Sequence, residues 1–328
     1  MRAAVCPRYG PPEVVEVEEL ASPVPEVGQV RVRVQAAAVN FPDVLLVADQ
    51  YQLSVPPPFV PGSEFAGVID SLGPELPDVA GGLAVGQRVM GTTLVGAFAQ
   101  EVVVAPGALT AVPAGVDDRS AAAFGVAHRT AYHVLRSVAV VQPGDEVVVL
   151  GAGGGVGLAA VQVAVALGAT VTAVASNADK LAVARAHGAA RLIDHRAGEL
   201  RPALRQALPG GGDVVVDPVG GELAEPALRS LRRGGRFVTV GYASGVIPRI
   251  PLNLVLLKGV HILGFQFVDF ATDWPDELAR NDRELTELLA SGRVRPHVGA
   301  TFGLDQVAEA LRYVADGRAV GKVVLDLG

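Results

Sequence analysis

The 328-residue sequence has one cysteine, few aromatic residues and no long apolar run. Its single cysteine, Cys6, excludes an intramolecular disulfide and a cysteine-rich structural zinc site, and it fits a reducing compartment. No uninterrupted apolar stretch of about 18 residues is present, so a membrane-spanning helix is not expected. The N-terminus shows no basic-then-apolar signal segment. We therefore expect a cytoplasmic protein without a membrane span.

Basic residues are not in excess and form no run. The net charge of −7 disfavours nucleic acid as the main partner. Aromatic residues make up 5% of a chain that is 50% hydrophobic, so valine, leucine and alanine must build the core. Such a composition suits buried parallel strands covered by helices with small side chains. The length allows one large or two medium domains.

The first 120 residues or so are rich in proline, glycine and valine. Polar and apolar residues alternate at Gln29–Val34, Val85–Met90 and Phe98–Val104. Such alternation is typical of half-buried antiparallel strands. This part of the chain is predicted to form a compact, mostly β unit.

From about residue 121 buried strands alternate with helices. Ser120 is expected to cap a helix that runs to Leu135. Gly168 and Gly188 stand where glycine commonly ends a helix. Strands are predicted at 146–150, 170–175, 190–194, 213–217, 236–240 and 260–265, and helices near 155–167, 178–187, 198–207 and 222–232. This alternation predicts an α/β fold with a doubly wound parallel sheet.

The C-terminal part adds predicted helices at about 276–291 and 305–316 and a last strand at 322–327. Because the parallel sheet is complete without these elements, we expect them to fold back onto the first, β-rich unit.

A glycine-rich turn follows the first strand of the predicted parallel sheet. Residues 147–157 read VVVLGAGGGVG, and an alanine-rich helix follows. Glycines allow a pyrophosphate to approach the backbone, and the helix N-terminus offers free N–H groups. The strict G-x-G-x-x-G pattern is absent, because Ala152 occupies the first position ahead of Gly154 and Gly157. The flanking strand and helix nevertheless make this turn a strong dinucleotide-binding signal.

The end of the second strand, at Ser176, carries no carboxylate. An acidic residue there would favour NAD, whereas a neutral end beside basic residues favours NADP. Asp179 comes three residues later and Lys180 follows it. Hydrogen bonds to charged groups contribute roughly 1.5–3 kcal/mol each, enough to select NADPH. The alternative is that Ser176 merely caps the next helix and Lys180 is a solvated surface lysine.

Segments along nearly the whole chain resemble a known family. They are 40–43 (NFPD), 61–67 (PGSEFAG), 130–133 (TAYH), 151–157 (GAGGGVG), 213–221 (DVVVDPVGG), 234–241 (GGRFVTVG) and 321–325 (GKVVL). Their order and spacing are similar to those of the zinc-independent quinone oxidoreductases of the medium-chain dehydrogenase/reductase superfamily. The resemblance implies a GroES-like β-rich catalytic domain over 1–122 and 268–328, and a Rossmann domain over 123–267.

The resemblance also implies a site for the 2′-phosphate of NADPH. Lys180 and Arg318 match a lysine and an arginine that hold this phosphate in the family, and His195 stands where a tyrosine is usual. An imidazole would make that contact sensitive to pH. Alternatively, His195 is an exposed loop residue and Arg318 a polar helix-end residue. The other expected cofactor residues are Ala152, Gly153, Gly154, Gly155, Val156, Ser176, Val219, Gly241, Tyr242, Phe265 and Gln266.

No metal is expected. Zinc-dependent relatives carry Gly-His-Glu where this chain has Gly62-Ser63-Glu64, and His128 and His133 are five residues apart, on different helix faces. Oxidation of an alcohol is therefore poorly supported. A quinone or an α,β-unsaturated carbonyl accepts hydride with less help, because negative charge spreads over the conjugated system, and the protein supplies orientation.

The candidate hydrogen-bond donors to such an acceptor are Asn40, Tyr51, His128 and Thr130. The resemblance places Asn40 and Tyr51 near the nicotinamide. Asn40 could instead cap a helix that starts near Phe41, and Tyr51 could simply pack on the prolines of its loop.

The expected function is hydride transfer from NADPH to a quinone or another α,β-unsaturated carbonyl. One alternative is an enoyl-thioester reductase, in which Arg129, unusual for the family, contacts an anionic substrate; Arg129 could equally face solvent. Another is a non-catalytic NADPH-binding protein. The sixth strand, 260–265, is expected at the sheet edge, where similar proteins form a homodimer.

Overall fold

The computed structural model describes residues 1–74, 76 and 84–328. They form two compact units. The first contains Met1–Val126 and Pro296–Gly328, and the second contains Ala127–Arg295. These two units are defined by how the chain packs. The domain boundaries predicted from the sequence, at 122/123 and 267/268, are not tested by this division and stay a prediction.

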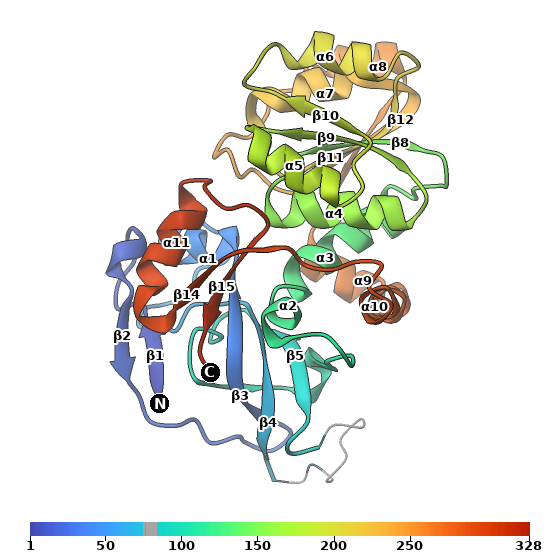
Figure 1. Cartoon of the computed structure of the whole chain (residues 1–328). Helices are drawn as coiled ribbons and strands as arrows, with labels where there is room; N and C mark the ends of the chain where they lie inside the picture. The colour runs from blue at the N-terminus through green and yellow to red at the C-terminus, as the bar shows by residue number, and fades with distance from the viewer. Residues whose placement is uncertain (75, 77–83) are drawn as a thin grey trace. The chain divides into compact units, whose positions relative to one another are not determined.

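The first unit is built on a seven-stranded mixed sheet, in which β3 and β4 form the longest pairing. Figure 1 shows these two strands side by side. The strand order is β14 (Val298–Gly303), β15 (Lys322–Asp326), β3 (Val30–Val39), β4 (Glu64–Leu72), β5 (Arg88–Thr92) and β7 (Leu109–Ala111), with β6 (Glu101–Val104) on β3. Valines at alternate positions of β3 are buried, which confirms the predicted half-buried antiparallel strand.

Two further strands, β1 (Arg2–Val5) and β2 (Glu16–Glu19), pair antiparallel beside this sheet. The helices of the first unit are α1 (Phe41–Val47), α2 (Asp118–Ala122) and α11 (Val307–Ala315). Strands β14 and β15 and helix α11 belong to this unit, so the chain after 296 folds back as predicted.

The second unit is a six-stranded sheet in which every strand pair is parallel. The order is β10 (Arg191–Asp194), β9 (Thr170–Ala175), β8 (Glu146–Leu150), β11 (Gly212–Asp217), β12 (Leu231–Thr239) and β13 (His261–Gly264). All six predicted strands are present, and β13 lies at the edge as expected. The strand order reverses between β8 and β11, the position at which this fold binds its ligand.

Helices cover both faces of this sheet: α4 and α5 lie on one face, and α6 and α7 lie on the other (Figure 1). Besides α3 (Gly125–His133), most of which lies in this unit, its α-helices are α4 (Gly155–Ala166), α5 (Ala178–Ala186), α6 (Leu200–Ala207), α7 (Ala224–Ser230), α8 (Leu252–Lys258), α9 (Phe267–Asp273) and α10 (Pro275–Ala290). The core around them consists mainly of valine, leucine and alanine side chains, as the composition predicted. Within the described ranges, no helix is both long enough and apolar enough to span a bilayer.

Helix α10 packs in the second unit rather than with the rest of the C-terminal part. It contacts α3 (Gly125–His133), where Asn281 Nδ2 lies 3.0 Å from His133 Nδ1. Both side chains are completely buried. The expectation that all of the tail packs on the first unit is therefore wrong for α10, because buried polar groups on α3 require partners that α10 supplies.

The helix expected to start at Ser120 starts earlier and is broken. Asp117 is its N-cap, and its carboxylate accepts the backbone N–H of Ser120 at 2.9 Å and the Ser120 hydroxyl at 2.7 Å. Helix α2 ends at Ala122, and α3 continues into a π-helical turn at Val134–Val138. The break precedes Gly125, where an added Cβ would lie 2.7 Å from Thr92 Cγ2.

Candidate functional site

The glycine-rich turn between β8 and α4 is tightly closed. Gly151 has φ +61°, and a Cβ on Gly157 would lie 2.0 Å from the Gly151 carbonyl oxygen, so both positions require glycine. Gly154 is the N-cap of α4 and has no side chain to satisfy the first N–H groups of the helix. These N–H groups, in the first turn at Gly155 and Val156, are thus left for an anion. Ala152 is buried and bonds to β9 through its backbone, Ala152 N to Val174 O at 3.0 Å.

Lys180 lies against this turn. A Cβ added to Gly153 would lie 2.4 Å from Lys180 Cβ and 2.6 Å from its Cγ. Asn177, not Ser176, caps α5, because its side chain accepts the Lys180 backbone N–H at 2.9 Å. The proposed cap at Ser176 is therefore wrong. Lys180 is not a fully solvated lysine either, since burial, followed by the nearby Arg196, lowers the pKa of its ammonium group.

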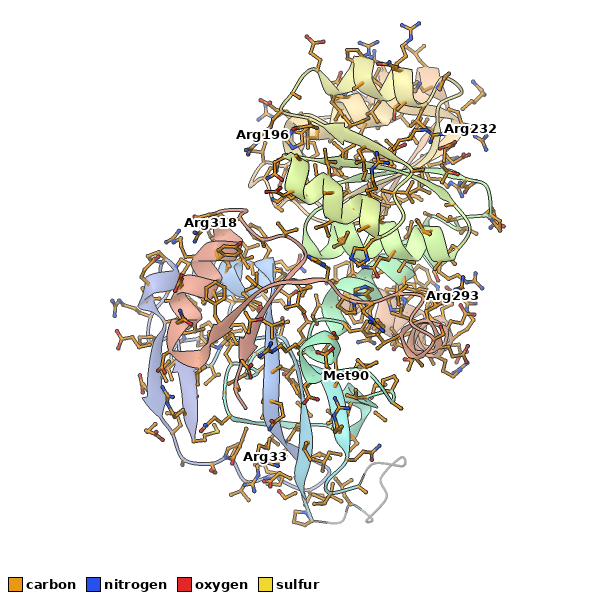
Figure 2. The ribbon with its side chains drawn as sticks, in the orientation of Figure 1. Arg33, Met90, Arg196, Arg232, Arg293 and Arg318 are labelled. Atoms are coloured by element: carbon orange, nitrogen blue, oxygen red, sulfur yellow. The ribbon has the colours of Figure 1, made fainter. Side chains whose placement is uncertain are left out.

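A second cationic position follows β10. Burial first, and then the charge of Arg196, lowers the pKa of His195, which Asp194 partly offsets. Lys180 adds to this lowering, so the two cations Lys180 and Arg196 lie beside His195 at the carboxyl ends of β9 and β10 and disfavour a charge on its imidazole. Figure 2 labels Arg196 in the loop after β10. Arg196 was not predicted from the sequence, although a basic residue two positions after a predicted strand end was a usable signal.

The end of β11 also reaches the glycine-rich turn. A Cβ on Gly151 would lie 2.6 Å from Val219 Cγ2, so the structure brings these two predicted cofactor residues together. Asp217 fixes the conformation of this loop, because its Oδ1 accepts hydrogen bonds from the backbone N–H groups of Val219 at 2.9 Å and Gly220 at 2.8 Å. Asp217 is fully buried, and burial raises the pKa of its carboxyl group.

The ends of β12 and β13 carry the remaining predicted cofactor residues of this unit. Tyr242 lies beside Gly220, where an added Cβ would be 2.9 Å from Tyr242 Cδ1, and Gly241 precedes it. Gln266 caps α9 by accepting the Asp269 backbone N–H at 2.6 Å. Phe265 stacks with the ring of His133 at 6.2 Å between centroids.

Arg318 follows α11 in the first unit and is labelled in Figure 2. Its guanidinium lies 4.6 Å from the centre of the Tyr313 ring, and its Nε is 3.7 Å from a carboxylate oxygen of Asp316. About half of the side chain, 51%, is exposed. Arg318 is therefore oriented by two neighbours and still accessible to a ligand.

Asn40 belongs to a buried polar cluster in the first unit. Its Nδ2 donates to Glu64 Oε1 at 2.9 Å and to Ser63 Oγ at 3.3 Å, and its Oδ1 accepts from Lys322 Nζ. Helix α1 does start at Phe41 with Asn40 as the preceding residue, as one alternative predicted. The Asn40 side chain nevertheless belongs to the cluster. In the first turn of the helix Asn40 bonds through its backbone N–H, which donates to Asp43 Oδ2 at 2.7 Å.

A buried ion pair lies at the centre of this cluster. Lys322 Nζ is 2.6 Å from Glu64 Oε1, and the two side chains are 3% and 1% exposed. The second oxygen, Glu64 Oε2, accepts the backbone N–H of Val126 at 2.8 Å. Glu64 and Lys322 lie in two of the segments that resemble the family, 61–67 and 321–325, yet no role was predicted for them from the sequence. Opposite charges in two otherwise apolar segments were the available signal.

Asp43 is a second buried carboxyl group in the cluster and is fully inaccessible. Burial raises its pKa to about 7, although the Asn40 N–H, the Ser63 hydroxyl and the Lys322 charge each act to lower it. The Ser63 hydroxyl lies close enough to act on the carboxyl group. Asp43 Oδ1 nevertheless makes no well-formed hydrogen bond within the described part of the chain. Burial, and then the charge of Asp43, raises the pKa of the half-buried Tyr51. The predicted residues Asn40 and Tyr51 therefore share one environment with Asp43.

The other two predicted donors, His128 and Thr130, lie on α3. His128 is buried and Thr130 is half-buried. Between them, Arg129 forms a two-pronged ion pair with Asp282, with both N···O distances at 2.8 Å, and covers the Phe267 ring at 4.8 Å. The alternative that Arg129 simply faces solvent is wrong, because α10 supplies a carboxylate for it.

Comparison with known proteins agrees with both units. Residues 26–114 match the model described as "Alcohol dehydrogenase GroES-like domain", and residues 155–282 match "Zinc-binding dehydrogenase". Quinone oxidoreductase-like protein 2 of Bos taurus is 36% identical over 328 residues, which cover 99% of this chain and 92% of that protein. This chain belongs to the quinone oxidoreductase family. It is thus an oxidoreductase of the medium-chain dehydrogenase/reductase superfamily.

Two further similar proteins are of different types, a quinone oxidoreductase and a much longer polyketide synthase protein. The quinone oxidoreductase of Thermus thermophilus, solved also in complex with NADPH, is 33% identical, has a TM-score of 0.83, and is matched over 100% of both chains. A spectinabilin polyketide synthase system protein of Streptomyces orinoci is 39% identical over 316 residues. That match covers 94% of this chain but only 14% of the synthase protein.

One matched model is named for zinc, whereas Ser63 is expected from the sequence to stand where zinc-dependent relatives carry a histidine. In the ranges that the structure describes, no three His, Cys, Asp or Glu side chains gather in an arrangement that could hold a metal ion. The cation beside Glu64 is instead the ammonium group of Lys322.

Removing one partner of the Lys322–Glu64 pair should be costly, because the other charge would remain buried without compensation. We expect Lys322→Met to lower the free energy of unfolding by about 3–5 kcal/mol, measured by urea denaturation. The double variant Glu64→Gln/Lys322→Met should lose clearly less than the sum of the two single losses. Arg312→Met, which breaks the exposed pair with Glu13, is the control and should cost far less. Equal losses in Lys322→Met and Arg312→Met would show that the buried pair is not a structural requirement.

Proposed function

We propose that this chain transfers hydride from NADPH to a quinone or another α,β-unsaturated carbonyl. The observation that carries the proposal is the contact of Lys180 with the glycine-rich turn at Gly153, at a strand end without a carboxylate. This arrangement offers a pyrophosphate site and a cation for a 2′-phosphate side by side within one unit. The Thermus thermophilus relative, solved in complex with NADPH, supports the same cofactor.

The residues present fit the cofactor. The uncapped first turn of α4 would hold the pyrophosphate, and the close packing at Gly151 and Gly157 leaves no room for a side chain at these two positions. Lys180, His195 and Arg196 repel one another when all are charged, so binding of a phosphate dianion there would relieve an unfavourable charge group. Arg318 is proposed to add a further cation for the 2′-phosphate on the family resemblance alone.

NADPH, when bound, supplies the hydride, and the chain supplies position and hydrogen bonds. We propose that Tyr51 and Thr130 donate hydrogen bonds to the acceptor, since both side chains are half-buried. Asn40 acts as a positioning residue, because its amide is fully used by Glu64, Ser63 and Lys322. His128 is deeply buried and is proposed to shape the acceptor site from behind.

An enoyl-thioester reductase is the second candidate, and the similarity to part of a polyketide synthase protein favours it. The structure removes one argument for it, however. Arg129 already holds Asp282 in a two-pronged pair and would have to release that carboxylate to bind an anionic thioester.

A substrate panel tests the proposed function. Purified protein should consume NADPH with quinones and small enones, measured by the loss of reduced-nicotinamide absorbance, because both acceptors stabilise the charge that hydride addition creates. Enoyl-CoA esters are the comparison arm. Activity confined to thioesters would replace the quinone assignment with the second candidate. Tight NADPH binding without turnover on any acceptor would indicate a non-catalytic NADPH-binding protein.

The proposed cofactor preference depends on cations that bind the 2′-phosphate, a group that NADPH has and NADH lacks. Replacing Lys180 and Arg318 together with alanine should raise the KM for NADPH by about 100-fold or more, since each lost charged hydrogen bond is worth roughly 1.5–3 kcal/mol. The KM for NADH should change only a few-fold. Arg205→Ala, an exposed arginine on α6, is the control and should leave both constants unchanged. Equal effects on the two cofactors would contradict the 2′-phosphate assignment.

We also propose that two copies of the chain pair along β13. This strand is at the sheet edge, and Ile262 on it is 40% exposed. The preceding helix α8 exposes Leu252, Leu256 and Leu257 by 77%, 80% and 72%. An open strand edge beside so many exposed leucines is a surface that proteins normally cover.

Charge on this surface should therefore separate the copies. Leu256→Glu/Leu257→Glu is expected to convert a dimer into a monomer in sedimentation velocity, because burying two carboxylates at an apolar interface is costly. Leu94→Glu, which changes an exposed leucine of the first unit, should leave the dimer intact. A wild-type protein that sediments as a monomer at micromolar concentration would contradict this pairing.

A further inference from the structure

The buried cluster of the first unit contains more carboxyl groups than cations. Asp43 and Glu64 are 0% and 1% exposed, and the single ammonium group beside them, on Lys322, is 3% exposed. Glu64 binds Lys322 directly through Oε1 at 2.6 Å. Asp43 has no ion pair among the described residues; its Oδ2 accepts the backbone N–H of Asn40, and the Ser63 hydroxyl lies beside its carboxyl group. A buried carboxylate without a cation is unfavourable, so burial favours the protonated form of Asp43.

Ser63 connects this carboxyl group to the surface of the unit. Its side chain is half-buried, whereas Asp43 is fully buried. Asn40 Nδ2 donates to Ser63 Oγ at 3.3 Å, which leaves the hydroxyl proton of Ser63 free to donate elsewhere. The hydroxyl also lies beside the Asp43 carboxyl group. Asn40 thus orients a hydroxyl that can take a proton from Asp43 on one side and give one away on the other.

We propose that Asp43 stores the proton that reduction of the acceptor consumes and that the Ser63 hydroxyl delivers it. This proposal rests on the proposed function. Hydride addition at the β-carbon moves the conjugated electron pair onto oxygen and leaves an enolate. The Ser63 hydroxyl proton passes to the enolate while the Asp43 hydroxyl proton passes to Ser63 Oγ. Asp43 is left as a carboxylate and recovers a proton from water, so each turnover consumes one NADPH and one solvent proton.

The surroundings of Asp43 suit this role at neutral pH. Burial raises its pKa to about 7, and Glu64 adds to the rise, whereas Lys322, the Asn40 N–H and the Ser63 hydroxyl act against it. Tyr51 is the other titratable group that senses this carboxyl group. Asp43 therefore carries a proton below about pH 7 and loses it above, and delivery should fail as the pH rises.

The test is the pH profile of kcat with a slowly reduced enone at saturating NADPH. Wild-type kcat should be level below about pH 7 and fall above it, in line with the pKa of Asp43. Asp43→Asn and Ser63→Ala should each lower kcat at pH 6 by at least about tenfold and abolish the fall above pH 7. Asp49→Asn, an exposed aspartate just after the same helix, is the matched control and should keep the wild-type rate and profile.

The outcomes separate this proposal from the proposed function. A wild-type protein that consumes no NADPH with any acceptor would end both. A wild-type protein that turns over, with the fall above pH 7 kept in Asp43→Asn and Ser63→Ala, would end the proton store alone. If circular dichroism shows that Asp43→Asn does not fold, Ser63→Ala decides, because it removes only a half-buried hydroxyl. Loss of the fall in Tyr51→Phe, with Ser63→Ala unchanged, would overturn Ser63 as the donor.

Discussion

The ion pair between Lys322 and Glu64 is the interaction on which the first unit depends. It joins β15, at the end of the chain, to β4, and the same carboxylate binds the backbone of Val126 and the amide of Asn40. A buried carboxylate is tolerated only when donors surround it, so these four segments must assemble together. The C-terminal strand is thereby built into the centre of the unit. Asp43 lies in the same cluster without an ion pair among the described residues, and burial, to which the Glu64 charge adds a smaller effect, raises the pKa of its carboxyl group.

A comparable constraint organises the second unit, although it is steric rather than electrostatic. Helix α4 approaches the end of β8 so closely that any side chain at Gly157 would overlap the Gly151 carbonyl. The approach leaves the first turn of α4 without a side-chain cap, beside the stem of Lys180. Because Asp217 holds the neighbouring loop through two N–H groups, Val219 packs on the same turn. The surface proposed to bind phosphate is therefore made mostly of backbone, and its proposed charge comes from residues after β9 and β10.

Much of this architecture was predictable from local patterns. The strands at 146–150 and 170–175 have the predicted bounds, and the first turn of α4 lies where the glycine spacing places it. The errors concern partners. Ser120 has the right type for a helix cap, but Asp117 precedes it and binds its N–H. From the sequence alone, solvent exposure was an open alternative for Arg129, because its partner Asp282 lies 153 residues away on α10.

The sequence by itself determined the two fold classes, the glycine-rich turn and the absence of an acidic residue at the end of β9. These features depend on residues close together in the chain, where side-chain periodicity and backbone freedom act directly. Only the tertiary structure decided which charges are paired. Lys322 and Glu64 are 258 residues apart, and their contact arises because β3 pairs with both β15 and β4. No local pattern indicates such a register, and only the tertiary structure buries Asp43 and thereby raises the pKa of its carboxyl group.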